Sequence, residues 1–262
     1  MRPRRSLSTT EVLLLDVILV DFLAVGSSAL ALLQFVPGHQ VGVLHSTSLL
    51  LGLINLCSNP TFMTVIALDQ YIAIAHPILF HTWRRPQYYV KLSVIIWVSV
   101  LVLNLPVFYI LITTFVGYFD CLMIYSISTP WKAFLLFTEL VLGIMPILVI
   151  LVCYVSTAKK LVDMGAGKES MRSTKEQGLR TIGATLAVLV TTFAPFHVAQ
   201  VYVTVADLWD RGDPSLWLYA CYVKPYAWIL TFFSAFLNPV LYVFRLQRAG
   251  WRMRCCPALS SE

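Results

Sequence analysis

The chain has 262 residues, of which 58% are hydrophobic and only 12% are charged, and its formal net charge is +6. Its mean hydropathy of +0.77 is far above that of soluble domains of this length, which excludes an ordinary water-soluble protein. The basic residues are distributed as membrane topology requires, so contact with anionic lipid headgroups explains the charge better than nucleic-acid binding does.

Six segments are long and apolar enough to cross a hydrocarbon layer about 30 Å thick, which needs roughly 20 residues of helix. They run approximately over residues 11–35, 41–75, 88–113, 131–158, 181–206 and 216–244. Several hold apolar side chains on every helical face, and none alternates over about ten residues as a barrel strand would. The sequence therefore predicts an all-α integral membrane bundle that forms a single domain over residues 1–262.

Basic residues gather on one side of these segments. They precede the first, follow the second, and recur between the fourth and fifth and after the sixth, whereas the opposite side carries only Lys132, Arg211 and Lys224. Because cytoplasmic loops are enriched in Lys and Arg, we expect both the beginning and the carboxyl end in the cytoplasm. The chain is expected to be a multi-pass protein of the plasma membrane without a cleavable signal peptide.

Two polar stretches interrupt the pattern. The longest, residues 159–180, contains glycines and serines among charged residues and is interpreted as a flexible cytoplasmic loop. The outer stretch 207–215 carries three aspartates against one arginine, which predicts a somewhat acidic outer rim.

The segment after the last span, residues 245–256, places Leu246, Trp251 and Met253 among four arginines. This pattern predicts a short amphipathic helix on the inner leaflet. Cys255 and Cys256 stand beside it as palmitoylation candidates, because acylation favours thiols next to a membrane. The alternative is a pair of free cysteines in an unstructured tail.

Polar side chains inside hydrocarbon are costly and need a partner or a function, and here they stand in a recurring order. The six segments in turn contain Asp21; Asp69-Gln70-Tyr71; Trp97 with Pro106; Pro146 with Tyr154; Phe193-Ala194-Pro195-Phe196; and Asn238-Pro239-Val240-Leu241-Tyr242. This set resembles the second to seventh helices of the rhodopsin-like (class A) family of G protein-coupled receptors. Each motif is weak alone, but six in order at matching depths cover nearly the whole chain.

The resemblance implies a receptor that binds an extracellular ligand within the bundle and signals to a heterotrimeric G protein, with arrestin as a further partner. The residues matching the family's cytoplasmic switch are Asp69, Gln70, Tyr71, Tyr154 and Tyr242. Prolines inside spans remove a backbone hydrogen bond and mark places where helices can kink. No histidine or cysteine falls in a nucleophile or metal motif, so no enzyme is predicted.

A polar core is expected around Asp21, together with Asn59, Ser234 and Asn238. In the family this cluster coordinates a sodium ion that favours the inactive state. Here Asn59 replaces the usual small hydroxyl of the third helix, which leaves two alternatives open. One is a sodium site, and the other is a hydrogen-bonded cluster with Asp21 protonated. No other cofactor is expected.

The outer half contains aromatic and polar side chains suited to a ligand pocket. These are Glu139, Phe193, His197, Gln200, Lys224 and Trp228. The alternative is mutual satisfaction, in which Glu139 pairs with His197 and Lys224 reaches water. Gly52 occupies the position where amine receptors carry an aspartate, so the unknown ligand is not expected to be a biogenic amine.

The chain also departs from the family's pattern. Gln70 replaces the arginine that contacts the G protein, and it lacks a permanent charge and a forked donor set. Lys175 stands where an acid would lock that arginine. His45 stands where the third helix normally offers a cysteine, so Cys121 either pairs with Cys221 or stays free.

The beginning of the chain, Met1 to Arg5, resembles the family's first cytoplasmic loop, so the first helix has no counterpart and six of seven spans are expected. Two other functions therefore stay open. One is a non-signalling or truncated receptor-like protein. The other is a small transporter or channel of six spans, for which Asp21 and Glu139 are too few charges to line a path and no internal repeat is visible.

Overall fold

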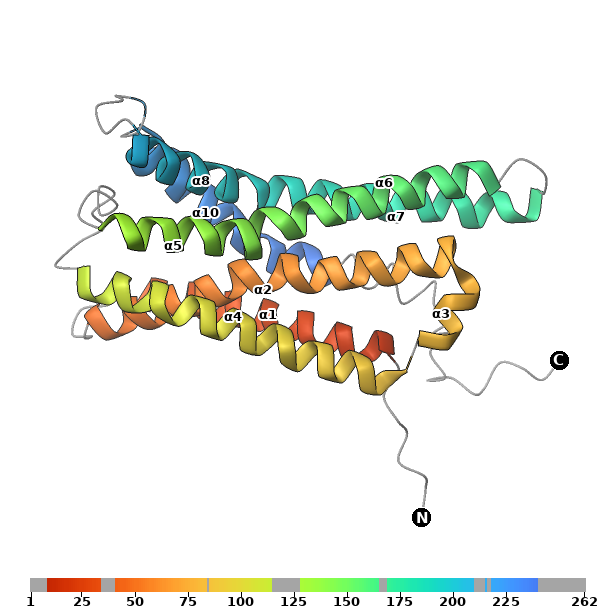
Figure 1. Cartoon of the computed structure of the whole chain (residues 1–262), viewed down its shortest axis with the longest axis horizontal. Coiled ribbons are helices and arrows are strands. Elements are labelled where there is room, and N and C mark those ends of the chain that lie inside the picture. Colours follow the sequence, from red (N-terminus) through yellow and green to blue (C-terminus); the bar gives the residue numbers. More distant parts are fainter. Residues whose placement is uncertain are drawn as a thin grey trace, which may run out of the picture.

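The computed structural model describes residues 9–33, 41–83, 85–114, 128–164, 169–209, 215 and 218–239. Every regular element in this part of the chain is helical, and the long helices lie side by side as a bundle (Figure 1). Six helices among these residues are long and apolar enough to span a membrane: Val12–Leu33, Ser46–Ala75, Pro86–Tyr109, Thr129–Asp163, Gly178–Trp209 and Tyr219–Pro239. The predicted all-α membrane bundle is confirmed.

The helices follow one another along the chain with short connections. The first four are α1 (Thr9–Leu33), α2 (Val41–Ala75), α3 (Pro77–Trp83) and α4 (Pro86–Thr114). The next span consists of α5 (Thr129–Glu139), the π-helical turn η2 (Leu140–Ile144) and α6 (Met145–Met164). Then come α7 (Glu169–Thr192), α8 (Ala194–Trp209), the π-helical turn η3 (Tyr219–Val223) and α10 (Lys224–Phe232), after which helical backbone resumes as far as Pro239.

The interpretation of residues 159–180 as a flexible loop is wrong. Helix α6 continues to Met164 and α7 already begins at Glu169, so most of this stretch is helix. Its Leu, Met, Lys, Glu, Gln and Arg residues are good helix formers, and the stretch is polar because the two helices extend past the apolar part of the bundle (Figure 1). The short α3, which begins at Pro77, was also not predicted; proline suits the first turn of a helix.

Two spans are interrupted next to prolines that the sequence singled out. The π-helical turn η2 ends immediately before Pro146, and a turn at Phe193 separates α7 from α8 two residues before Pro195. Proline has no backbone N–H and crowds the preceding helical turn, so regular hydrogen bonding is easily altered there. The break at Phe193 divides its span into an inner and an outer part.

The core lies between α2, α4, α6, α7 and α8. Its fully buried side chains include Phe62, Val100, Ile150 and Tyr154. Large apolar side chains also cover the outside of the bundle; Phe22, for example, is 71% exposed. Apolar residues on both sides of a helix are what a hydrocarbon solvent requires.

Helices α1 and α2 approach each other closely through small residues. The Ser27 hydroxyl donates a hydrogen bond to the Ser48 carbonyl, and the Ser48 hydroxyl donates one to the Ser27 carbonyl, both at 2.8 Å. Small side chains at a helix interface allow backbones to come near, and paired hydroxyls add hydrogen bonds that lipid cannot replace.

A buried ion pair joins α5 to α8 at the end of the bundle that we expect to face outward, at the left in Figure 1. Lys132 on α5 pairs with Asp207 on α8, and both side chains have 0% exposure. The expectation that Asp207 belongs to an acidic outer rim is therefore wrong for this residue. An unpaired charge is costly in a low-dielectric interior, and burial together with an opposite charge reduces that cost.

We predict that Lys132→Met destabilises the protein, because it leaves the Asp207 carboxylate buried without its cation. Breaking one side of a buried ion pair typically costs about 3–5 kcal/mol. The double variant Lys132→Met with Asp207→Leu should recover most of the loss, since no charge is left uncompensated. The measurement is the thermal unfolding midpoint of the purified chain in detergent, with Lys91→Gln, at an exposed lysine, as the control. Equal midpoints for Lys132→Met and the parent would refute the role of the pair.

Candidate functional site

The polar cluster around Asp21 joins α1, α2 and the last span, Tyr219–Pro239. Asn59 and Asn238 each donate a side-chain hydrogen bond to Asp21 Oδ1, at 3.1 and 2.9 Å. Asn238 Nδ2 also lies 3.4 Å from Asn59 Oδ1. All three side chains are buried. Ser234 is buried as well, but its hydroxyl donates to the Thr231 carbonyl of its own helix at 2.6 Å.

Two oxygens of this cluster have no hydrogen-bond partner among the described residues. They are Asp21 Oδ2 and Asn238 Oδ1, and both are buried. Buried acceptors without a donor call for an ion, a water or a proton. A carboxylate and an amide oxygen suit a hard cation such as sodium, so the residues present fit such an ion.

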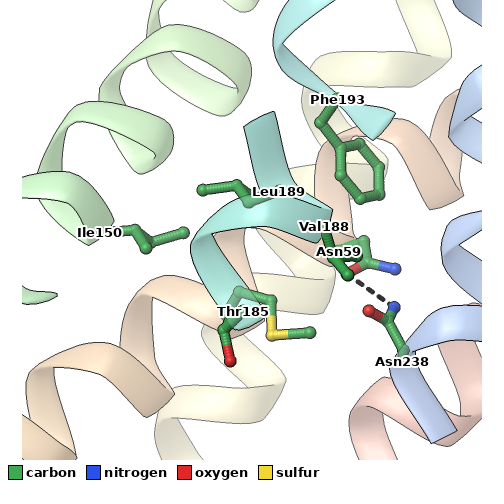
Figure 2. A pocket seen from close by; sticks show the side chains of 8 residues that line it. Asn59, Ile150, Thr185, Val188, Leu189, Phe193 and Asn238 are labelled. Atoms are coloured by element: carbon green, nitrogen blue, oxygen red, sulfur yellow. Dashed lines mark hydrogen bonds between the residues drawn. The ribbon is translucent and has the colours of Figure 1, made fainter. Parts of the chain in front are cut away.

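A small cavity adjoins the cluster between α2, α6, α7 and the last span (Figure 2). Its lining consists of Asn59, Met63, Ile150, Thr185, Val188, Leu189, Phe193 and Asn238. The structure thus places Phe193, which the sequence grouped with the outer ligand candidates, beside the polar core. The break between α7 and α8 is next to this cavity, where packing is incomplete.

Glu139 and His197 are brought together in the outer half. The His197 Nδ1 atom is hydrogen-bonded to Glu139 Oε1, which links α5 to α8. The imidazole has 0% exposure and the carboxylate side chain 11%. Of the two alternatives drawn from the sequence, the structure shows mutual pairing for these two residues.

Gly143 in the π-helical turn makes this pairing geometrically available. A Cβ atom at this position would overlap His197 Nδ1 and would lie 2.9 Å from Glu139 Oε1. The imidazole therefore rests directly on the backbone of η2. This role of Gly143 was not predicted from the sequence, because a glycine inside an apolar segment carries no sign of which side chain will approach it.

Trp228 lies across from Gly52. A Cβ atom at Gly52 would be 2.7 Å from Trp228 Cζ2, so the indole occupies the space that a side chain would need there. The indole also packs against Phe196, with ring centroids 5.2 Å apart, and against Phe232 at 6.3 Å. The position that an aspartate fills in amine receptors is taken by an aromatic ring.

The remaining outer candidates lie apart from the Glu139–His197 bond. Gln200 is half-buried and donates to the Thr204 hydroxyl of its own helix at 3.2 Å. Lys224 is half-buried at the first residue of α10. It lies within electrostatic range of Glu139, although no ion pair within 4.0 Å is found for it among the described residues.

The opposite end of the bundle contains most of the switch residues. Asp69 accepts a hydrogen bond from the Tyr89 hydroxyl of α4, while Gln70 is half-buried at the end of α2. Tyr71 packs edge-on against His76 at a centroid distance of 6.1 Å, and Tyr154 is fully buried. Tyr242, the predicted tail helix and the side chains of Lys175 and His45 lie outside the described residues.

Cys221 is disulfide-bonded, whereas Cys57 and Cys153 are free and buried. Cys121 lies outside the described residues, as do the palmitoylation candidates Cys255 and Cys256. Pairing of Cys221 with Cys121 stays a prediction.

A second carboxylate between helices, Asp16, was not among the predicted site residues. Its Oδ1 accepts hydrogen bonds from Ser93 Oγ at 2.8 Å and from Trp97 Nε1 at 3.1 Å, which ties α1 to α4. An acid within an apolar span was a signal in itself. It could have been read alongside Asp21, five residues further along.

Known proteins resemble the chain over most of its length. The family model described as 7 transmembrane receptor (rhodopsin family) matches residues 1–242. Purinoceptor 2 of Rattus norvegicus is 29% identical over 149 residues, which are 56% of this chain and 40% of the relative. Somatostatin receptor type 4 of the same species is 26% identical over 217 residues, 78% of this chain and 53% of the relative. The chain spans about half the length of the curated relatives it matches.

We predict that Gly143→Ala separates His197 from Glu139, because the added methyl group would occupy the place of the imidazole. Overpacking of this kind typically costs about 1–3 kcal/mol. The matched control is Gly183→Ala, at a helical glycine where an added Cβ meets nothing within 4 Å; it should stabilise the protein by up to about 1 kcal/mol. Thermal unfolding of both variants in detergent is the measurement. Similar behaviour of the two variants would contradict the close approach at Gly143.

Proposed function

Because the chain belongs to the rhodopsin family of seven-transmembrane receptors, we propose that it binds a ligand in the outer half of the bundle and signals to a heterotrimeric G protein at the opposite end. It is a multi-pass membrane protein, and its family is one of receptors. We place it in the plasma membrane with its carboxyl end in the cytoplasm, where arrestin would be a second partner. We assign no catalytic role to any residue.

The observation that carries this proposal is the break between α7 and α8 at Phe193. It lies between the outer polar residues and the inner end of the bundle, beside the cavity that Phe193 lines. A signal needs two packed arrangements whose balance a ligand can change. A helix interrupted next to incomplete packing supports such a rearrangement, because α7 can reorient with a smaller loss of contacts than a continuous helix would suffer.

The outer half supports a ligand other than a biogenic amine. Trp228 fills the space beside Gly52, so an ammonium group would meet an indole ring and no carboxylate at this position. The similar proteins are named purinoceptors and somatostatin receptors. Purines and somatostatin are therefore the first ligands to test, by measuring binding to membranes that contain the chain.

The inner end supports weak coupling. Asp69 is engaged by Tyr89 of α4, and the neighbouring Gln70 offers a neutral amide where the family has an arginine. A neutral amide makes weaker hydrogen bonds to carbonyl and carboxylate groups than a guanidinium does.

We predict that Gln70→Arg raises basal G protein activation. A hydrogen bond to a charged group contributes about 1.5–3 kcal/mol, so nucleotide exchange on the G protein should rise on the order of tenfold. Gln70→Lys is the matched control; it adds a charge without the planar fork and should raise exchange less. Exchange would be measured with purified G protein and equal amounts of each variant in vesicles. No gain for Gln70→Arg with any G protein class would argue against coupling through this end of α2.

We further propose that the cluster of Asp21, Asn59 and Asn238 binds sodium. The unpartnered Asp21 Oδ2 and Asn238 Oδ1 support this hypothesis, and a bound ion would supply the charge that the buried carboxylate lacks. The ion would hold α1, α2 and the last span together and thereby favour one arrangement of the bundle.

We predict that sodium raises the thermal stability of the purified chain relative to potassium at equal ionic strength. A ligand at ten times its dissociation constant adds about 1.4 kcal/mol. Asp21→Asn should abolish the difference between the two ions, because it removes the negative charge while keeping the shape. Asp16→Asn, at the other carboxylate between helices, should leave the difference intact. Equal stability of the parent in both salts would favour a protonated Asp21.

A further inference from the structure

Glu139 lies where four elements of the outer half meet. It is the last residue of α5 and is bonded to His197 of α8. Its charge also reaches Lys224 of α10 and Cys57 of α2. The Cys57 thiol is directed to Asn104 Oδ1 at 3.6 Å, so the two groups left to compete for the carboxylate are His197 and Lys224.

The contact with His197 is closely built. Gly143 lets the imidazole rest on η2, and the ring is fully enclosed. Its second nitrogen, Nε2, is buried without a hydrogen-bond partner among the described residues. The bond to Glu139 is therefore the polar contact that the structure provides for this imidazole, and losing it would leave both ring nitrogens unsatisfied in an apolar interior.

Lys224 is placed differently. It is half-buried, and no ion pair within 4.0 Å engages it among the described residues. The π-helical turn η3 comes directly before it. A lysine has a flexible four-carbon stem, and an ammonium in apolar surroundings gains much by approaching a carboxylate. The other anion of this region, Asp207, is already paired with Lys132.

We propose that Glu139 is shared between two helices: it pairs with His197 in the arrangement seen here and with Lys224 in a second arrangement, in which α8 is released from α5. Exchange of the partner would couple the outer ends of α8 and α10, the elements on either side of Trp228 and Phe196. This rests on the proposed function only where signalling is used as the readout. The exchange itself is a property of the bundle.

The proposal predicts effects of opposite sign. His197→Asn removes the partner seen here and shifts the bundle toward the Lys224 arrangement, whereas Lys224→Gln removes the competitor and shifts it the other way. We expect changes on the order of fivefold or more in basal G protein activation, up for one variant and down for the other. Lys224→Arg keeps a cation and should resemble the parent, and Lys91→Gln controls for loss of a lysine charge elsewhere.

Glu139→Gln supplies the decisive comparison. In this background the effects of His197→Asn and Lys224→Gln should both disappear, because the shared anion is gone. Effects of the same sign, or effects that persist in Glu139→Gln, would overturn the proposal. Should His197→Asn fail to fold, the Lys224→Gln change and its loss in Glu139→Gln decide alone.

A second readout separates this proposal from the proposed function. A fluorophore on Lys159→Cys, at an exposed position of α6, reports on the inner end of the bundle without any G protein, in a full chain with Cys255→Ser and Cys256→Ser. Opposite fluorescence shifts without G protein activation in any variant would sustain the exchange and count against signalling. Activation without opposite shifts in either readout would sustain signalling and refute the exchange.

Discussion

Hydrocarbon offers no hydrogen bonds, and every polar side chain inside the bundle must therefore find its partner on another helix or on its own backbone. The contacts between helices follow from this constraint. Asp16 holds Trp97, Asp21 holds Asn238, and Lys132 holds Asp207. Apolar packing alone would not choose among many ways of placing six similar helices, because lipid solvates apolar side chains equally well. The polar pairs specify which faces meet.

These contacts fall into layers along the bundle. The outer layer contains two bonds between α5 and α8, Lys132 with Asp207 and Glu139 with His197. The middle layer contains the Asp21 cluster and the cavity next to Phe193. A receptor of this family must carry a change at one end to the other, and the middle layer is the place where packing is least complete. The layers are linked by the span that breaks at Phe193.

Small residues decide how near the helices come. Gly143 gives the His197 ring access to the backbone of η2, and Gly52 gives the Trp228 indole access to α2. In both places a missing side chain on one helix is filled by a large ring from another. Such pairs cannot be recognised from spacing along the chain, since the partner lies 54 or 176 positions away; they arise only when the helices are assembled.

The class of the protein could be predicted from its amino-acid sequence. The long apolar segments predict helices across a membrane, because a buried backbone must bond within its own segment, and the motifs at Asp21, Asp69 and Asn238 indicate the family. Helix ends beyond the membrane were missed, because polarity marks where the lipid ends and gives no direct sign of where a helix ends. The assembled bundle was needed to show that Asp207 is buried against Lys132 and that His197 takes Glu139. Partner choice depends on the rotation and approach of whole helices, which short-range periodicity does not contain.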